Sequence, residues 1–223
     1  MPLSAPTPAP AAAPPRRPGE RTADRILDAA EAVFAERGFA GAALRDVADR
    51  AGVRAPSLYN HFESKASLYA AVLERALGPL LRLLAEAAAG RGPRDSRALV
   101  AEVMALLARH PNLPRLVAQE TLAGGRRLTP MLQRWIAPAF ARARELVEGG
   151  KAPPRFPADQ LPHLVLAMYH VVVGYFTTAE LYAQVAGEDA LSEGALARQT
   201  RFLQQLVSLL FPDEAPREAA EPR

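Results

Sequence analysis

Polar and small side chains between residues 54 and 60 have the types and spacing needed to form hydrogen bonds with DNA bases. If this stretch is helical, Leu58 and Phe62 face a core. The opposite face then carries Arg54, Ala55, Ser57 and Asn60. Arginine pairs naturally with guanine and asparagine with adenine. The stretch therefore predicts a short recognition helix, about Ala55 to His61, that lies in a major groove and contacts base edges.

Two helices joined by a tight turn, within residues 44–62, would position this face. Ala48 is small enough to let a second helix approach, and Gly52 can take the left-handed conformation that the turn requires. The side chains available to bury the seam are Leu44, Val47, Val53 and Leu58. The spacing fits a helix-turn-helix, although on its own it fits an ordinary helical hairpin about as well.

The flanks of the motif favour the helix-turn-helix. An amphipathic helix precedes it, and another helix follows it directly. The residues that carry the pattern are Ile26-Leu27, Ala30, Phe34, Gly38-Phe39, Val47-Ala48, Ala51-Gly52-Val53, Ser57-Leu58-Tyr59, His61-Phe62 and Ser64-Lys65. Over about residues 21–70, the chain resembles the TetR family of bacterial transcriptional regulators.

This resemblance implies which side chains hold the DNA backbone. By their places in the family's motif, Tyr59, His61 and Lys65 contact phosphates, and Arg45 joins them or contacts a base. The resemblance also implies that the helix after Ser64 is a lever, through which an occupied pocket changes the spacing of two DNA-binding modules.

The chain departs from the family's pattern before each helix of the motif. Segment 39–44 has alanines where the family usually has Thr and Ser, so we expect no hydroxyl cap, a loss of about 1 kcal/mol. The backbone N–H groups there could still meet a phosphate. Arg54 stands where a Ser cap is common, which makes it a candidate for contact with a base or a phosphate.

Composition limits the other possibilities. The 223 residues, 49% apolar, suffice for a small DNA-binding module and a larger domain with a core of its own. The lack of cysteine excludes thiolate zinc sites, disulfides and a cysteine nucleophile, and it agrees with a cytoplasmic location, at the nucleoid when DNA is bound.

Charge gives a mixed indication. Residues 20–66 contain seven Arg or Lys against eight Asp or Glu, so the module lacks the basic sum expected of a DNA-binding domain. Its distribution favours DNA, because four of the acidic residues belong to the first helix. The basic side chains expected at the DNA-contacting surface are Arg45, Arg50, Arg54, His61 and Lys65.

Helical periodicity predicts an all-α fold in four parts. Residues 1–19, with seven prolines and five alanines, form a disordered tail, and residues 213–223 form another. Arg16, Arg17 and Arg21 could form an arm that touches DNA, or they belong to a solvated tail. The DNA-binding domain spans 20–66 and opens with a helix from Thr22, its N-cap, to Arg37, stopped by Gly38.

The C-terminal ligand-binding and dimerisation domain spans 67–212. A helix from Ser64 to about Ala89, bent at Gly78-Pro79, links it to the DNA-binding domain. Further helices are expected at about 95–109, 112–123, 128–148, 158–186 and 192–211, and no segment alternates like a strand.

The helix at 158–186 contains a charge-free run from Leu161 to Ala179, close to the length of a membrane span. We reject a span because the run contains Pro162, Gly174 and two histidines, and because basic residues do not border it closely. We expect it to be buried by the domain core on one side and by a second subunit on the other. Together with 192–211, it predicts a four-helix homodimer interface, and two half-sites on DNA demand such a dimer.

Candidate pocket residues lie on apolar helix faces, where a place in the core is the favoured interpretation of each. They are Met104, Leu107, Glu120, Trp135, Phe140, Met168, Tyr169, His170 and Tyr175. Glu120 shares a face with apolar residues, so its carboxylate needs a partner, either an inner arginine or a cationic effector. His163 and His170 share a helix face but lack the further ligands of a metal site, so no metal or cofactor is expected.

No enzymatic signature is present. Gly124-Gly125-Arg126-Arg127 lacks the ending and the preceding strand of a phosphate-binding loop. We therefore expect a homodimeric DNA-binding regulator, a repressor, that binds a near-palindromic operator and is released by a small, largely apolar effector. The alternatives are a constitutive helix-turn-helix protein without an effector and, more remotely, a small all-α enzyme.

Overall fold

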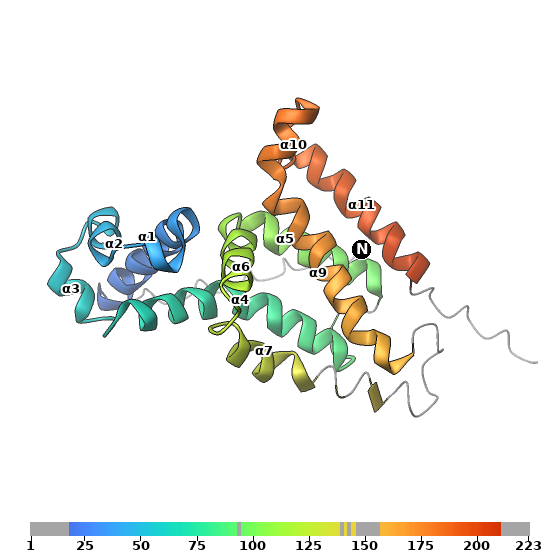
Figure 1. Ribbon diagram of the computed structural model, residues 1–223, viewed down its shortest axis with the longest axis horizontal. Coiled ribbons are helices and arrows are strands. Elements are labelled where there is room, and N and C mark those ends of the chain that lie inside the picture. Colours follow the sequence, from blue (N-terminus) through green and yellow to red (C-terminus); the bar gives the residue numbers. More distant parts are fainter. Residues whose placement is uncertain (1–17, 93–94, 139–140, 142–143, 146–156, 211–223) are drawn as a thin grey trace, which may run out of the picture.

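The computed structural model describes residues 18–92, 95–138, 141, 144–145 and 157–210, and within them it contains helices and no strand. The predicted all-α class is therefore confirmed. The predicted tail 1–19 is too long by two residues, because Pro18 and Gly19 begin the first helix. The rest of both predicted tails, including Arg16 and Arg17, and the candidate Phe140 lie outside the described residues. Figure 1 shows a DNA-binding module of α1, α2 and α3 at one end, joined by the long α4 to the remaining helices.

The first helix, α1 (Pro18–Gly41), begins earlier than predicted and changes direction where predicted. Thr22 lies inside it, so the prediction of Thr22 as N-cap is wrong. Gly38 has φ 69° and ψ 173°, a non-helical conformation that glycine adopts without steric cost. The chain then makes one more turn, with the Ala42 N–H donating to the Gly38 carbonyl at 3.2 Å, before α2 (Leu44–Ala51) starts.

The core of the module consists of the apolar side chains that the periodicity selected. Fully buried residues come from α1, α2, α3 (Ala55–Tyr59) and α4 (Lys65–Ala88), and they include Ile26, Phe34, Val47, Leu58, Leu68 and Val72. Burying each such side chain contributes roughly 1.5–3 kcal/mol relative to exposure. One compact core thus holds the helix-turn-helix against α1 and α4.

The linking helix α4 starts at a capping box. The Ser67 N–H donates to the Ser64 hydroxyl and the Ser64 N–H to the Ser67 hydroxyl, both at 3.0 Å, as expected for a Ser64 cap. The helix continues past Pro79 to Ala88. Arg75 ties it to α1 by ion pairs to Asp28 at 2.7 Å and Glu31 at 3.1 Å.

The C-terminal helices pack around the second half of α4 (Figure 1). They are α5 (Ser96–Arg109), α6 (Asn112–Leu122), α7 (Thr129–Trp135), the short 3₁₀ helix η1 (Ala158–Gln160), α9 (Leu161–Thr177), α10 (Ala179–Ala186) and α11 (Glu193–Leu210). α11 packs against α5, while α6 lies between α1 and α9. α6 therefore touches both the DNA-binding module and the C-terminal core.

Two predicted helices differ from the structure. The helix expected at 128–148 is interrupted: α7 ends at Trp135, a turn follows at Ile136, and the residues described after it up to 145 are helical again. The helix expected at 158–186 is two helices, α9 and α10, bent by 61°. Thr177 and Thr178 donate hydroxyl hydrogen bonds to carbonyls of the preceding turn, including Thr178 to Gly174 at 2.7 Å, and such bonds bend helices.

The bend also bears on membrane spanning. Within residues 18–210, apart from the gaps, no single helix has the length and apolar character to cross a bilayer. The bent pair Pro162–Thr177 and Ala179–Ala186 has the required length and apolar character only when its two helices are counted together.

Candidate DNA-binding surface

The turn of the helix-turn-helix has the predicted geometry. Gly52 ends α2 in the left-handed conformation, at φ 64° and ψ 39°. Its N–H donates to the Asp49 carbonyl at 3.2 Å, and the Val53 N–H donates to the Ala48 carbonyl at 3.0 Å. These bonds satisfy carbonyls at the end of α2 and direct the chain into α3.

Arg25 also holds this turn, a contact that no sequence pattern indicated. Its guanidinium, on α1, donates to the Ala51 carbonyl and, at 3.3 Å, to the Gly52 carbonyl. A cation at a helix C-terminus is favourable because the last carbonyls carry partial negative charge. Since Arg25 and Ala51 are 26 positions apart, no local pattern could have paired them.

The recognition helix α3 is shorter than predicted. It ends at Tyr59, so Asn60 and His61 lie in the turn that follows rather than in the helix. Leu58 is fully buried, and Phe62 packs partly buried against the core, as the sequence predicted. The predicted DNA-contacting residues Arg54, Ala55, Tyr59, Asn60 and His61 are exposed, while Ser57 is half-buried.

Both helices of the motif start without a side-chain cap. Ala43 precedes α2 and Arg54 precedes α3, each in an extended conformation, and neither side chain accepts a hydrogen bond from its helix. The expected loss of a hydroxyl cap is therefore confirmed. The first N–H groups of α2 are left to solvent or to an anion.

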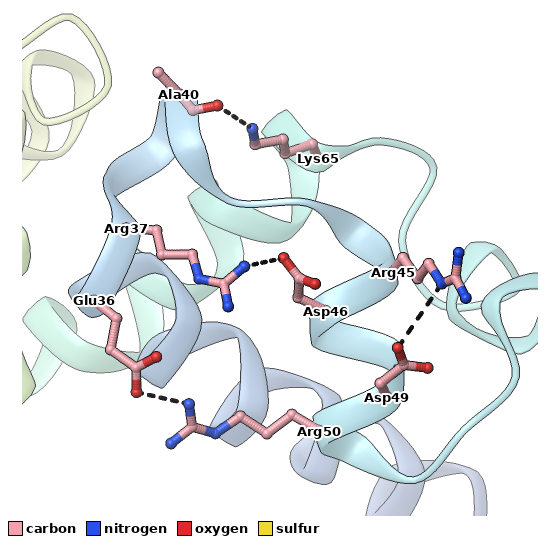
Figure 2. Close-up of polar contacts among 8 residues, drawn as sticks. All are labelled: Glu36, Arg37, Ala40, Arg45, Asp46, Asp49, Arg50 and Lys65. Atoms are coloured by element: carbon pink, nitrogen blue, oxygen red, sulfur yellow. Dashed lines mark hydrogen bonds and ion pairs between the residues drawn. The ribbon is translucent and has the colours of Figure 1, made fainter.

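Ion pairs within the module neutralise several of its carboxylates, so the slight acidic excess of residues 20–66 does not exclude DNA binding. Glu36 pairs with Arg50 at 2.7 Å, and Asp46 pairs with Arg37 (Figure 2). Arg75 pairs with two further carboxylates of α1. Arg50 points toward α1 and Arg45 points away from it. Arg50 is therefore paired with α1, and its place in the DNA-contacting cluster stays a prediction.

Arg45 and Lys65 have partners of different strength. The Arg45 side chain is 88% exposed and lies 3.9 Å from the Asp49 carboxylate, a pair worth little in water. The Lys65 ammonium donates to the Ala40 carbonyl at 3.2 Å and lies 4.8 Å from the Phe39 ring centroid (Figure 2). Lys65 thus sits beside the connection into α2 with ammonium hydrogens to spare.

Two of the hollows in the described part of the chain lie between α1 and α2, at Arg25 and Arg50, and between the module and α6. Of the eight described candidates, Glu120 alone lines either of them. Met104 and Leu107 are core residues of α5, and the Tyr175 hydroxyl donates to the Ala190 carbonyl.

The remaining candidates lie around α6, α7 and α9. The Tyr169 hydroxyl is 3.2 Å from the Thr121 hydroxyl, Met168 is half-buried, and His170 is exposed. The buried indole N–H of Trp135 has no acceptor among the residues that the structure describes. In the same part of the chain, no three His, Cys, Asp or Glu side chains are arranged to hold a metal ion.

Glu120 has the inner arginine partner that its burial required. Its carboxylate accepts hydrogen bonds from the Arg127 N–H at 2.9 Å and from the Arg127 guanidinium at 3.3 Å. The pKa of the Tyr69 hydroxyl is raised to about 12, mainly because it is buried and also because the charged Glu120 lies beside it and accepts its hydrogen bond. Of the two partners left open by the sequence, the arginine is the one present.

The fold and the turn define a helix-turn-helix DNA-binding protein, and comparison with known proteins gives its family. Residues 26–72 match the family described as "Bacterial regulatory proteins, tetR family", and residues 94–207 match "Tetracyclin repressor-like, C-terminal domain". The regulator RutR of Escherichia coli is 30% identical over 190 residues, 82% of this chain and 83% of RutR. The chain belongs to the TetR family of transcriptional regulators, which are DNA-binding proteins and not enzymes.

Other relatives match over a shorter stretch. The activator FasR of Mycolicibacterium smegmatis is 54% identical over 50 residues, 22% of this chain and 23% of FasR. The repressor KstR2 of Rhodococcus jostii is 46% identical over 55 residues, 25% of this chain and 27% of KstR2. The chain thus matches about a quarter of the length of each of these two relatives.

A solved structure from Streptomyces coelicolor, SCO4942, has the same fold along most of the chain. It is 25% identical, covers 86% of this chain and 98% of its own, and gives a TM-score of 0.64. The fatty acid degradation regulator FadR of Bacillus halodurans has the same fold at 18% identity and a TM-score of 0.61, over 87% and 96% of the two chains.

Proposed function

We propose that the chain is a homodimeric repressor that binds a near-palindromic operator and leaves it when a small, largely apolar molecule occupies the C-terminal domain. The observation that carries the DNA part is the exposed face at α3. Leu58 anchors the helix from below, while Arg54, Ala55 and Asn60 remain open to solvent. One helix of five residues reaches few base pairs, so two copies are needed for a specific site.

The phosphate contacts proposed for this surface surround α3. Tyr59, 55% exposed, and His61 flank the helix, and Lys65 lies beside the connection into α2. Arg45, on the side of α2 that faces away from α1, adds a fourth candidate (Figure 2). We assign the DNA-binding domain to residues 20–66 and the effector and dimer domain to 67–212.

The dimer is proposed to form through α9, α10 and α11. α9 carries no formal charge, yet Phe176 is the one buried residue among its described side chains. Leu166 on α9 is 54% exposed, and Phe202 and Leu209 on α11 are 55% and 68% exposed. Apolar patches of this kind mark interaction surfaces, and the twofold symmetry of a palindromic operator makes a second copy of the chain the fitting occupant.

The effector site is proposed to lie among α5, α6, α7 and α9. Apolar side chains of these four helices belong to the hydrophobic core, and the Trp135 indole N–H is a buried donor without an acceptor among the described residues. The Tyr169 and Thr121 hydroxyls lie 3.2 Å apart at an exposed position between α6 and α9. A few polar groups in an apolar setting are typical of small-molecule sites. The effector must bind the DNA-incompetent shape better, and operator binding must weaken effector binding by the same factor.

Selection of duplexes from a random pool, followed by fluorescence anisotropy and sedimentation, tests the DNA part. We expect a dimer on two half-sites roughly 34 Å apart. Asn60→Ala and Ser57→Ala should change which bases are preferred, because a good bidentate contact is worth about 1–3 kcal/mol of discrimination. A monomer that binds no duplex at low salt would overturn the proposal, and unchanged base preference would remove Ser57 and Asn60 from it.

A thermal-shift screen of apolar small molecules, read together with a promoter assay, tests regulation. A stabilising compound should lower operator affinity and raise transcription. If no compound stabilises the protein, it is a constitutive DNA-binding protein. If transcription rises when the protein binds, it is an activator, as FasR is named.

A further inference from the structure

Arg127 connects the C-terminal domain directly to the DNA-binding module. It lies in the loop between α6 and α7, and the carbon at the centre of its guanidinium is 3.6 Å from the centroid of the Phe39 ring. Phe39 directly follows the Gly38 kink, where the chain leaves α1 for the helix-turn-helix. A cation stacked on an aromatic face is attracted by the negative charge of the ring face, and the attraction grows when water is excluded.

The C-terminal side of this contact is held rigidly. The Glu120 side chain, 1% exposed, accepts hydrogen bonds from the Arg127 backbone and guanidinium, and Tyr69 of α4 donates a third. Gly125, at φ 69°, folds the loop back, and its N–H donates to the Glu120 carbonyl at 2.8 Å. A buried carboxylate needs several partners, so the guanidinium has little freedom to move.

The DNA-binding side is held equally well. The Phe39 ring centroid is 5.1 Å from that of Tyr69 in an edge-on arrangement. The Lys65 ammonium lies over the same Phe39 ring and donates to the Ala40 carbonyl. One aromatic ring therefore contacts both Arg127 and the lysine for which we propose a phosphate contact.

A second contact lies close to the first. The Gln119 amide nitrogen donates to the Ala35 carbonyl of α1 at 2.9 Å, and Gln119, Glu120 and Arg127 line one hollow together with Gly38 and Phe39. α6 and the loop after it thus contact the module at the end of α1. A small rotation of the module about these contacts would tilt α2 and α3 together.

We propose that Arg127 is a positioning residue for operator binding: through Phe39 it fixes the angle between the DNA-binding module and the C-terminal domain. This inference depends on the proposed dimeric function. In a dimer, the angle sets the distance between the two copies of α3, and hence the half-site spacing that the protein accepts. Base preference within a half-site belongs to α3 itself and does not depend on Arg127.

The test measures affinity for operators whose half-site spacing differs by one base pair in either direction. The variants are Phe39→Leu, which removes the ring but leaves the Glu120–Arg127 pair, and Arg127→Met, which removes the charge. Arg126→Met is the matched control, because Arg126 is exposed in the same loop. Arg127→Lys keeps a cation near both Glu120 and Phe39.

We expect the wild-type protein to prefer one spacing by about tenfold, within the usual range of coupling between sites. Phe39→Leu and Arg127→Met should reduce the preference to about threefold or less with unchanged preference for bases within a half-site. Arg127→Lys should restore part of it, and Arg126→Met should match the wild type. Circular dichroism and sedimentation identify any variant that does not fold or dimerise, and Phe39→Leu then carries the test if Arg127→Met fails.

Other results overturn the inference in distinguishable ways. A wild-type dimer that binds all spacings equally, or a folded Phe39→Leu variant that prefers one spacing as strongly as the wild type, refutes the positioning role alone. A wild-type chain that binds no duplex as a dimer refutes the proposed function, and the positioning role with it.

Discussion

The DNA-binding module and the last helices of the chain differ in how they use apolar residues. In the module, Ile26, Phe34, Val47 and Leu58 are completely buried within a single chain. α9 is the most apolar helix of the protein by composition, yet Val165 and Leu166 remain 46% and 54% exposed. The module thus buries its apolar residues within one chain, whereas we propose that a second copy of the chain covers the C-terminal face. The stability of the DNA-binding module should not depend on protein concentration, whereas the stability of the C-terminal helices should increase with it.

The largest effect expected from this comparison is that of Phe34→Ala. Removing a fully buried phenylalanine from a packed core typically costs about 3–5 kcal/mol, which is a large part of the stability of a small module. The module should unfold at a lower urea concentration and bind operator DNA more weakly, while sedimentation should still detect the dimer. Leu122→Ala, at a position 89% exposed, serves as the control. Loss of the dimer along with the module would show that the two regions are not separate.

A pH effect at the joint between the regions comes next. Because the pKa of Tyr69 is raised from 10.0 to about 12, the unfolded chain ionises first as pH rises. Stability should therefore be unaffected below about pH 10 and fall between about pH 10 and 12, by up to about 2–3 kcal/mol. In denaturation experiments, the free energy of unfolding of Tyr69→Phe should depend less on pH between about pH 10 and 12. If it falls as much in Tyr69→Phe as in the wild type, Tyr69 is not the cause of the fall.

Phe202→Glu tests the C-terminal face. Phe202 is 55% exposed on α11, so a glutamate costs the isolated chain little, but it places a charge in the proposed dimer interface. We expect dimerisation to weaken by about 2 kcal/mol or more, as at an interface hot spot. Sedimentation across a concentration series measures this. Glu193→Gln, at an exposed position in the first turn of α11, is the control, and an undisturbed Phe202→Glu dimer would place the interface elsewhere.

Lys65→Ala should have the smallest effect of the four. If Lys65 contacts a phosphate, its loss weakens binding to all sequences alike and reduces the salt dependence by about one unit. Anisotropy titrations at several salt concentrations measure the slope. If the salt dependence of Lys65→Ala equals that of the wild type while its stability is lower, Lys65 only stabilises the structure through Ala40 and Phe39 and does not contact a phosphate.

The sequence predicted most of the module because its signals are local. Gly52, Ala48 and Leu58 lie within one motif, and each has the expected conformation or burial. The length of α3 was overestimated because Asn60 and His61 keep the polar pattern of a helix face after the helix has ended.

Contacts between distant elements were not predictable in this way. The burial of Glu120 predicted an arginine, but no sequence pattern could select Arg127 over other arginines or place it on Phe39. The bend at Thr178 was missed because the threonine hydroxyls, and not a proline or glycine pattern, interrupt the long apolar run. The predicted pocket residues were chosen by apolar faces, which core residues such as Met104 share.

The length of α4 has a geometric consequence for gene regulation. Its 24 residues span about 36 Å at 1.5 Å per residue. Rotating a rod of that length by about 5° around its far end displaces the near end by about 3 Å, close to the 3.4 Å rise between successive nucleotides. A rotation of this size, if it were passed along α4, would therefore move α3 by about one step along the duplex.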